Sequence, residues 1–129
     1  MILVEAKAHI DEMFSSGSQA SQESLTQITD ALDQTISAFG AKPLINWAGP
    51  LYQMANRLAH LHFLTMHGVP TSLVFVCLVG DTEMNGPESA DEWRGALQVA
   101  RRMLGLAKRH NFSGRVIFFP YTSELAVNE

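Results

Sequence analysis

The segment Thr71–Val79 reads TSLVFVCLV, and from Leu73 onward every residue is apolar. A strand that is apolar at every position, rather than at alternate positions, is typical of the centre of a parallel sheet with helices on both faces. Gly80 and Asp81 follow as turn residues and mark the end of the strand. The segment therefore predicts an α/β fold with this strand in the middle of the sheet and covered on both sides.

Segments before and after this strand show the spacing and end signals of helices. Helical spacing of apolar residues stops at Gly40 and again at Gly68, and glycine commonly ends helices. Ser89 and Glu92 have the capping-box spacing that begins a helix. The expected elements are a strand over 1–8, a helical turn over 9–14, helices over 21–39 and 50–67, the strand over 71–79, a helix after 89, and a strand over 115–119 that Pro120 closes.

This order, β-α-α-β-α-β, predicts a single domain over residues 1–129 with a mixed, largely parallel sheet flanked by helices. Three strands make a thin sheet for a chain of 129 residues. Three sources of a further strand stay open: the tail from Tyr121, a segment upstream of Met1, and a partner chain.

The net charge of −4 argues against a protein that is held to nucleic acid by its overall charge. The single cysteine, Cys77, excludes an intramolecular disulfide, suits a reducing cytoplasm and reads as a small buried apolar residue. No signal peptide, membrane-spanning run, GxSxG, Walker A or GxGxxG motif is visible, so we expect a soluble cytoplasmic protein. Six of the nine basic residues lie in one C-terminal stretch: Arg94, Arg101, Arg102, Lys108, Arg109 and Arg115. Four of them, Arg101, Arg102, Lys108 and Arg109, close a predicted helix, where cations complement the helix dipole.

The first predicted strand carries two charged residues on otherwise apolar sequence. Strand side chains alternate, so Glu5 and Lys7 are expected on the same side of the sheet as Leu3, with Ile2 and Val4 on the other side. A carboxylate can bind Mg²⁺, and a neighbouring ammonium can orient water and stabilise charge on a phosphate. The alternative is an edge strand with two solvated charges that protect it from aggregation.

Two further groups of residues are candidate metal ligands. His60, His62 and His67 share one predicted helix, but none of them has the i, i+4 spacing of a helical zinc pair, which favours ordinary helix-surface histidines. Asp81 and Glu83 follow the C-terminal end of a parallel strand, where open α/β sheets bind ligands. A turn with an acidic helix start explains the same two residues without a metal.

A family resemblance is carried by short segments spread along most of the chain: Leu51–His60, Gly68–Pro70, Leu73–Phe75, Val79–Asp81, Gly86–Pro87, Glu92–Arg94 and Leu104–Leu106. They resemble a group of poorly characterised bacterial proteins that is similar to the PD-(D/E)XK nuclease-like superfamily. The resemblance implies a restriction-endonuclease-like core, in which a hairpin places an Asp beside a strand that bears Glu-x-Lys.

In that core, Glu5 and Lys7 match the Glu-x-Lys positions, and the carbonyl of Ala6 matches the usual backbone metal ligand. Gln53 is the best match to the polar residue of the following helix that contacts DNA or the site, with Arg57 behind it. The resemblance therefore implies Mg²⁺ or Mn²⁺ as cofactor and DNA as partner.

The chain departs from the superfamily pattern at the motif Asp, because only four apolar residues precede Glu5. A Mg²⁺ ion needs several oxygen ligands, and one carboxylate with one carbonyl holds it poorly. Three explanations stay open: the start is truncated and the nuclease-like core is N-terminally incomplete, a dimer supplies strands across its interface, or the protein is an inactive remnant that keeps the scaffold.

The resulting hypothesis is metal-dependent hydrolysis of phosphodiester bonds in nucleic acid. Glu5 would act as metal ligand and Lys7 would polarise water and phosphate, while Gln53 and Arg57 would be supporting contacts. The alternative is a non-catalytic oligomeric or binding protein that keeps the nuclease-like scaffold. It predicts a homo-oligomer, such as a homodimer, in which the strand over 1–8 pairs with a second copy.

Overall fold

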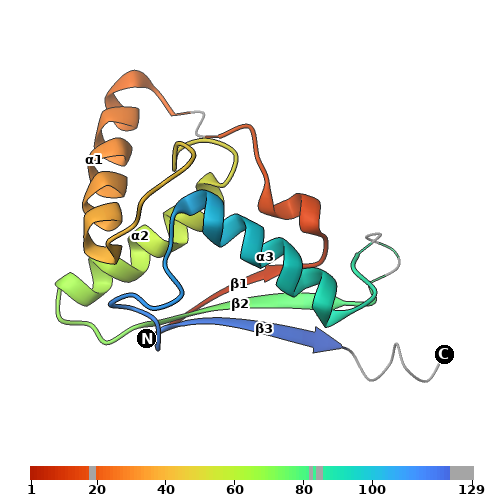
Figure 1. Ribbon diagram of the computed structural model, residues 1–129. Coiled ribbons are helices and arrows are strands. Elements are labelled where there is room, and N and C mark those ends of the chain that lie inside the picture. The colour runs from red at the N-terminus through yellow and green to blue at the C-terminus, as the bar shows by residue number, and fades with distance from the viewer. Residues whose placement is uncertain (18–19, 82, 84–85, 123–129) are drawn as a thin grey trace.

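The computed structural model describes residues 1–17, 20–81, 83 and 86–122, and these residues form an α/β fold with one open parallel sheet (Figure 1). The strands lie in the order β1-β2-β3, and both neighbouring pairs are parallel. The elements along the chain are β1 (Ile2–Lys7), the 3-10 helix η1 (Ile10–Met13), α1 (Gln22–Phe39), α2 (Tyr52–Met66), β2 (Ser72–Val79), α3 (Ala90–Leu104) and β3 (Val116–Thr122). The predicted α/β class and the central position of the 71–79 strand are confirmed.

The helices begin and end at the residues that the sequence marks. Ser21 and Ser89 each accept a backbone hydrogen bond as N-cap of α1 and α3, and Gly40 ends α1 in the left-handed conformation with φ of 64°. The expected capping box is shifted by one residue, because the Glu92 carboxylate accepts from the backbone of Glu88 and not of Ser89. Within the described residues, the helices are too short or too polar to cross a membrane.

The core lies between the helices and one face of the sheet. The side chains of Leu73, Phe75 and Cys77 on β2 point toward the helices and are at most 3% exposed. The Trp93 indole of α3 donates to the carbonyl of Leu78 and so connects this helix to β2, whereas the Trp47 indole donates to the carbonyl of Leu104 and connects the 41–51 segment to the end of α3. The buried side chains on the helices and connections include Leu32, Phe39, Leu51, Leu58, Leu61, Leu97 and Phe112.

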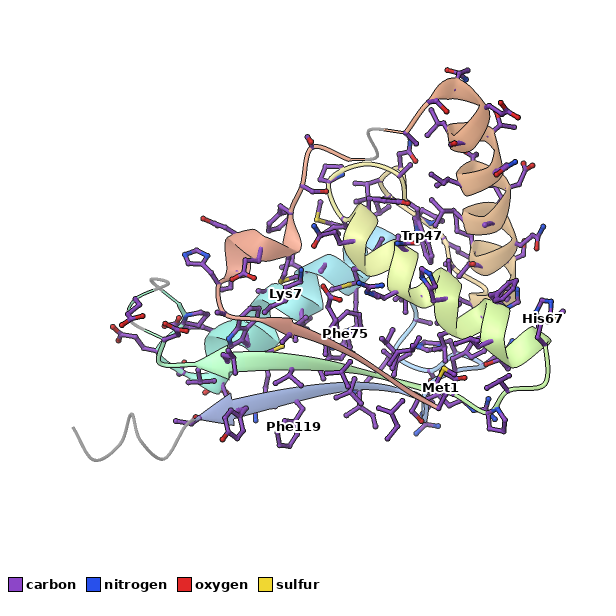
Figure 2. All side chains as sticks on the ribbon, turned by 180° about the vertical axis from the view of Figure 1, so that it is seen from behind. Met1, Lys7, Trp47, His67, Phe75 and Phe119 are labelled. Carbon is purple, nitrogen blue, oxygen red and sulfur yellow. The ribbon has the colours of Figure 1, made fainter. Side chains whose placement is uncertain are left out.

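The other face of the sheet is not covered by any described residue, so the expectation of helices on both faces is wrong. Figure 1 shows α1, α2 and α3 on the same side of the three strands. In Figure 2, Phe75 points toward the helices and Phe119 points away from them. The exposed fraction is 62% for Val4 and 50% for Phe119. An all-apolar strand predicts burial on both faces, but it does not say whether the same chain provides the second cover.

The last strand is longer than expected. β3 continues through Pro120 to Thr122, and Pro120 lies opposite Cys77 of β2. A proline is tolerated there because β3 is an edge strand, where a missing backbone donor need not interrupt the ladder. The suggestion that the tail adds a fourth strand concerns residues 123–129, which lie outside the described part of the chain.

Candidate functional site

Alternation along β1 places its two charged side chains on the helix-covered side of the sheet. Glu5 and Lys7 lie on the same side of the sheet as Leu3, as predicted, and the structure shows that this side faces α2. Gln53 and Arg57 lie one turn apart on α2, and this i, i+4 spacing puts them on one face of the helix. The structure therefore brings together the four predicted side chains, which we call the Glu5 cluster: Glu5, Lys7, Gln53 and Arg57.

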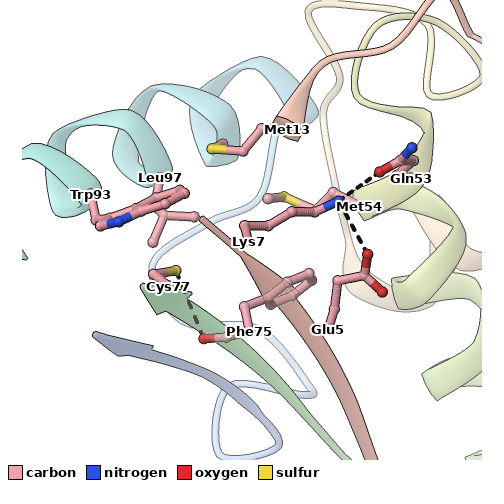
Figure 3. Close-up of a pocket in the computed structure, with 9 residues that line it drawn as sticks. All are labelled: Glu5, Lys7, Met13, Gln53, Met54, Phe75, Cys77, Trp93 and Leu97. Atoms are coloured by element: carbon pink, nitrogen blue, oxygen red, sulfur yellow. Dashed lines mark hydrogen bonds and ion pairs between the residues drawn. The ribbon is translucent and has the colours of Figure 1, made fainter. Parts of the chain in front are cut away.

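Direct polar contacts connect all four members of the Glu5 cluster. The Lys7 ammonium lies 3.1 Å from Glu5 Oε1 and donates to Gln53 Oε1 at 2.7 Å (Figure 3). Arg57 Nε donates to the second carboxylate oxygen, Glu5 Oε2, at 2.7 Å. Two cations thus surround one carboxylate, and the cluster carries a net charge of +1.

The cluster is well shielded from solvent on the strand side and open on the helix side. The exposed fraction of the side chain is 13% for Lys7 and 18% for Glu5, but 42% for Arg57. Burial alone would raise the pKa of the Glu5 carboxyl, but hydrogen bonds from Arg57 and Lys7 and their positive charges outweigh burial. The pKa of Glu5 therefore lies below its ordinary value of 4.5, and the carboxylate is ionised at neutral pH.

We expect the lowered pKa of Glu5 to make the free energy of unfolding depend on pH in the acidic range. A carboxyl whose pKa is lower in the folded state stabilises the fold above pH 4.5, and this contribution is lost as pH falls through the lowered pKa. Urea unfolding between pH 7 and pH 3 should therefore show a steeper loss of unfolding free energy below pH 4.5 in the wild type than in Glu5→Gln. Asp33→Asn, on the exposed side of α1, is the matched control and should retain the wild-type slope.

The space beside the cluster is small and mostly apolar. A cavity of about 10 Å³ adjoins Glu5 and Lys7, which is room for a single water molecule. Its other lining side chains are Met13, Gln53, Met54, Phe75, Cys77, Trp93 and Leu97 (Figure 3). Burial raises the pKa of the Cys77 thiol to about 11, so this cysteine is not a thiolate nucleophile. A larger ligand can therefore reach the cluster only from its solvent side, where Arg57 is exposed.

The described residues do not by themselves fit a Mg²⁺ site. Both carboxylate oxygens of Glu5 are paired with cations, Lys7 and Arg57. The neighbouring Ala6 could offer only its backbone carbonyl as a ligand. Within residues 1–17, 20–81, 83 and 86–122, no group of three or more His, Cys, Asp or Glu side chains is placed to hold a metal ion. A Mg²⁺ ion prefers six oxygen ligands in octahedral geometry, so a paired carboxylate is not sufficient.

His60 and His62 of α2 and His67, the residue that follows it, do not converge on one point. The Nδ1 atoms of His60 and His67 lie 2.7 and 2.8 Å from the carbonyls of Asn56 and Phe63 on the same helix. Among the described residues, the buried His62 Nδ1 atom has no hydrogen-bond partner, and the His62 ring packs edge-on against Phe112. These environments are those of helix-surface and core-edge side chains.

Asp81 and Glu83 lie after the C-terminal end of β2, as predicted. The ends of the loop are tied by hydrogen bonds from Gly80 to Pro87 and from Gly86 to the Asp81 carbonyl, both at 2.8 Å. Glu83 is exposed. Residues 82, 84 and 85 lie outside the described part of the chain, so a metal site in this loop stays a prediction.

A basic groove between α3 and β3 is a second concave surface that the sequence did not define. It has a volume of about 480 Å³, and the Arg101 guanidinium lies 5.6 Å from the centre of the Phe118 ring on its wall. The lining residues are Arg94, Leu97, Gln98, Arg101, Arg102, Leu106, Lys108 and Phe118. The spacing of Arg94, Gln98 and Arg101 on one helix face was the available signal, but the contribution of β3 was not predictable.

Comparisons with protein-family models, with curated proteins and with solved structures each found no match to this chain.

Proposed function

We propose that this chain belongs to a nuclease-like protein in which the Glu5 cluster binds a phosphate of nucleic acid. Hydrolysis of the phosphodiester bond would then depend on Mg²⁺ or Mn²⁺, with further acidic ligands from outside the described residues. The observation that carries the proposal is the convergence of Glu5, Lys7, Gln53 and Arg57 from a strand and a helix. These are the positions that the PD-(D/E)XK resemblance assigns to the site.

The charges of the cluster favour a phosphate ligand. Lys7 and Arg57 are donors without acceptor atoms, and both residue types bind phosphate oxygens strongly. Glu5 neutralises only one of the two cations. Arg57, with 42% of its side chain exposed, is the group that an approaching phosphate would meet first.

The place of the cluster in the sheet also supports a nuclease-like core. Within the described residues β1 pairs only with β2, so its other edge is free to pair with additional strands. The superfamily core has strands with the motif Asp beside the Glu-x-Lys strand. An Asp that approached from this edge would supply the second carboxylate that the described residues do not place beside Glu5.

The test is a pair of assays on one set of variants. The wild-type chain should bind a fluorescent DNA oligonucleotide and cleave plasmid DNA with added Mg²⁺ or Mn²⁺, and Lys7→Ala should weaken binding roughly tenfold and abolish cleavage. Lys42→Ala, which removes an exposed lysine from the 41–50 connection, is the matched control for net charge. Cleavage that Lys7→Ala leaves unchanged would contradict the proposal, as would a chain that neither binds nor cleaves DNA.

The second candidate is a non-catalytic binding or oligomeric protein on the same scaffold. It is favoured by the closed state of the cluster, in which Glu5 is fully paired and only one water fits beside it. In that case the free edge of β1 would pair with another copy, as the homodimer hypothesis states. DNA binding without metal-dependent cleavage would select this candidate over the nuclease.

A further inference from the structure

The uncovered face of the sheet is continuous and apolar. Side chains that point away from the helices come from alternate positions of all three strands, and the strand register places them in rows across the sheet. We call this surface the open face; its apolar residues are Ile2, Val4, Ala6, Val74, Val76, Leu78, Ile117, Phe119 and Tyr121, and the uncharged Ser72 lies beside Ile2 at one end of it. None of these residues is charged, although the chain has 22 charged side chains among Lys, Arg, Asp and Glu.

The rows show how the open face is built. Val4, Val74 and Ile117 lie side by side on neighbouring strands, and Val76 lies beside Phe119 in the next row. The helix side of β1 includes the charged residues Glu5 and Lys7, and both have polar partners within the chain. The open face, in contrast, carries no charged side chain, and a surface that is apolar and uncharged is typical of one that becomes buried in an interface.

The size of the open face matches one half of a protein interface. Its five most exposed side chains, Ile2, Val4, Ile117, Phe119 and Tyr121, have exposed fractions between 45% and 69%. At roughly 100 Å² for each of these five side chains, the open face presents on the order of 500 Å² of apolar surface. This area lies toward the upper end of the roughly 300–600 Å² of the largest apolar patch on a typical monomer, and it is more than half of the ~800 Å² that each partner buries in a standard interface.

We propose that the open face is covered by the open face of a second copy of this chain, in a two-fold homodimer with sheet packed on sheet. A two-fold interface places the same surface on both sides, and an uncharged apolar face is complementary to itself. Two sheets pack about 10 Å apart with interdigitated side chains, which suits the branched and aromatic residues of the rows. A charged partner would find no counter-charge here.

This interface differs from pairing of β1 along its free edge. Edge pairing joins backbone groups and leaves the outward side chains exposed, so it does not explain the apolar rows. The face-to-face dimer also leaves the Glu5 cluster accessible, because the cluster lies on the helix side of the sheet. The two proposals can therefore fail independently: loss of DNA binding does not bear on the dimer, and the reverse also holds.

The first measurement is the mass of the chain in solution. Light scattering across protein concentrations up to about 100 µM should give a dimer, twice the 14.2 kDa of one chain. Phe119→Glu should raise the dissociation constant at least ~100-fold, because each copy would bury a charge without a partner. Val99→Glu is the matched control, since Val99 is 58% exposed on α3 and faces away from the sheet, and it should leave the dimer intact.

A second measurement does not depend on how well a charged variant folds. Cys77 is buried with a pKa of about 11, so a new surface cysteine is the thiol that a maleimide modifies in the folded chain. Ile117→Cys should be modified at least ~10-fold more slowly at 100 µM protein than at 0.1 µM, where the dimer dissociates. Val99→Cys should react at one rate at both concentrations.

Three results would contradict the face-to-face dimer. A monomer at 100 µM in which Ile117→Cys reacts slowly would mean that another segment of polypeptide covers the open face. A monomer in which it reacts fast would mean that the face is not covered in solution. A dimer that resists Phe119→Glu while Ile117→Cys reacts freely would assign the interface to the β1 edge.

Discussion

Gly105→Ala should reduce the free energy of unfolding by about 3 kcal/mol or more, whereas Gly40→Ala should cost only about 1 kcal/mol. Both glycines follow the last residue of a helix in the left-handed conformation, with φ of 75° and 64°. A side chain at either position is strained by the backbone alone. The two sites differ in what a methyl group would meet.

A β-carbon at Gly105 would collide with the backbone of Lys42 and Pro43, whereas one at Gly40 would meet no atom within 4 Å. The collision lies at a junction, because Lys42 donates to the Gly105 carbonyl at 2.9 Å and Leu44 donates to the Met103 carbonyl at 3.0 Å. The connection between α1 and α2 is thus hydrogen-bonded to the end of α3. An alanine side chain at position 105 would therefore push this connection away from the end of α3.

The measurement is urea unfolding followed by tryptophan fluorescence. Trp47 reports on this junction directly, because its indole donates to the carbonyl of Leu104. Gly40→Ala controls for the conformational strain that both variants share. Equal losses of stability in the two variants would contradict the close packing of the connection against α3.

The sequence was sufficient to predict the helices and strands and the α/β class, because the signals for them act between residues close together in the chain. The caps at Ser21 and Ser89 and the left-handed glycine at Gly40 act within one turn of their helices, so their residue types indicate the ends. The contact of Gly105 with Lys42 joins residues 63 positions apart, and no local pattern predicts it. Which face of the sheet receives the helices is likewise a tertiary outcome.

The candidate site was predictable to a different degree for each residue. Alternation alone places Glu5 beside Lys7, but it does not show that this side faces the helices. Gln53 and Arg57 came from the family resemblance, and the structure brings them to the same carboxylate. Spacing could show only that these two share a helix face. The resemblance also implies a set of metal ligands, but the described residues contain no group of three or more His, Cys, Asp or Glu side chains that could hold a metal ion.

Glu5→Ala should reduce the free energy of unfolding by about 2–3 kcal/mol, because it leaves the shielded Lys7 ammonium beside Arg57 without the carboxylate that separates them. Arg57→Ala should cost about 1 kcal/mol or less, since 42% of that side chain is exposed and solvent screens its charge. In the double variant, the loss should be smaller than the sum of the single losses, because Arg57 no longer repels Lys7. Additive losses would contradict a shared ion-pair network.

Glu5→Gln separates the structural role of the carboxylate from its role at a phosphate. This substitution raises the net charge of the cluster from +1 to +2, whereas Lys7→Ala lowers it to 0. If the cluster binds phosphate, Glu5→Gln should tighten oligonucleotide binding several-fold at low salt and abolish metal-dependent cleavage, while Lys7→Ala should weaken binding and also abolish cleavage. A purely structural ion pair predicts changes in stability with no ordered change in affinity. The affinity order Glu5→Gln, wild type, Lys7→Ala therefore tests whether these charges meet a ligand or only one another.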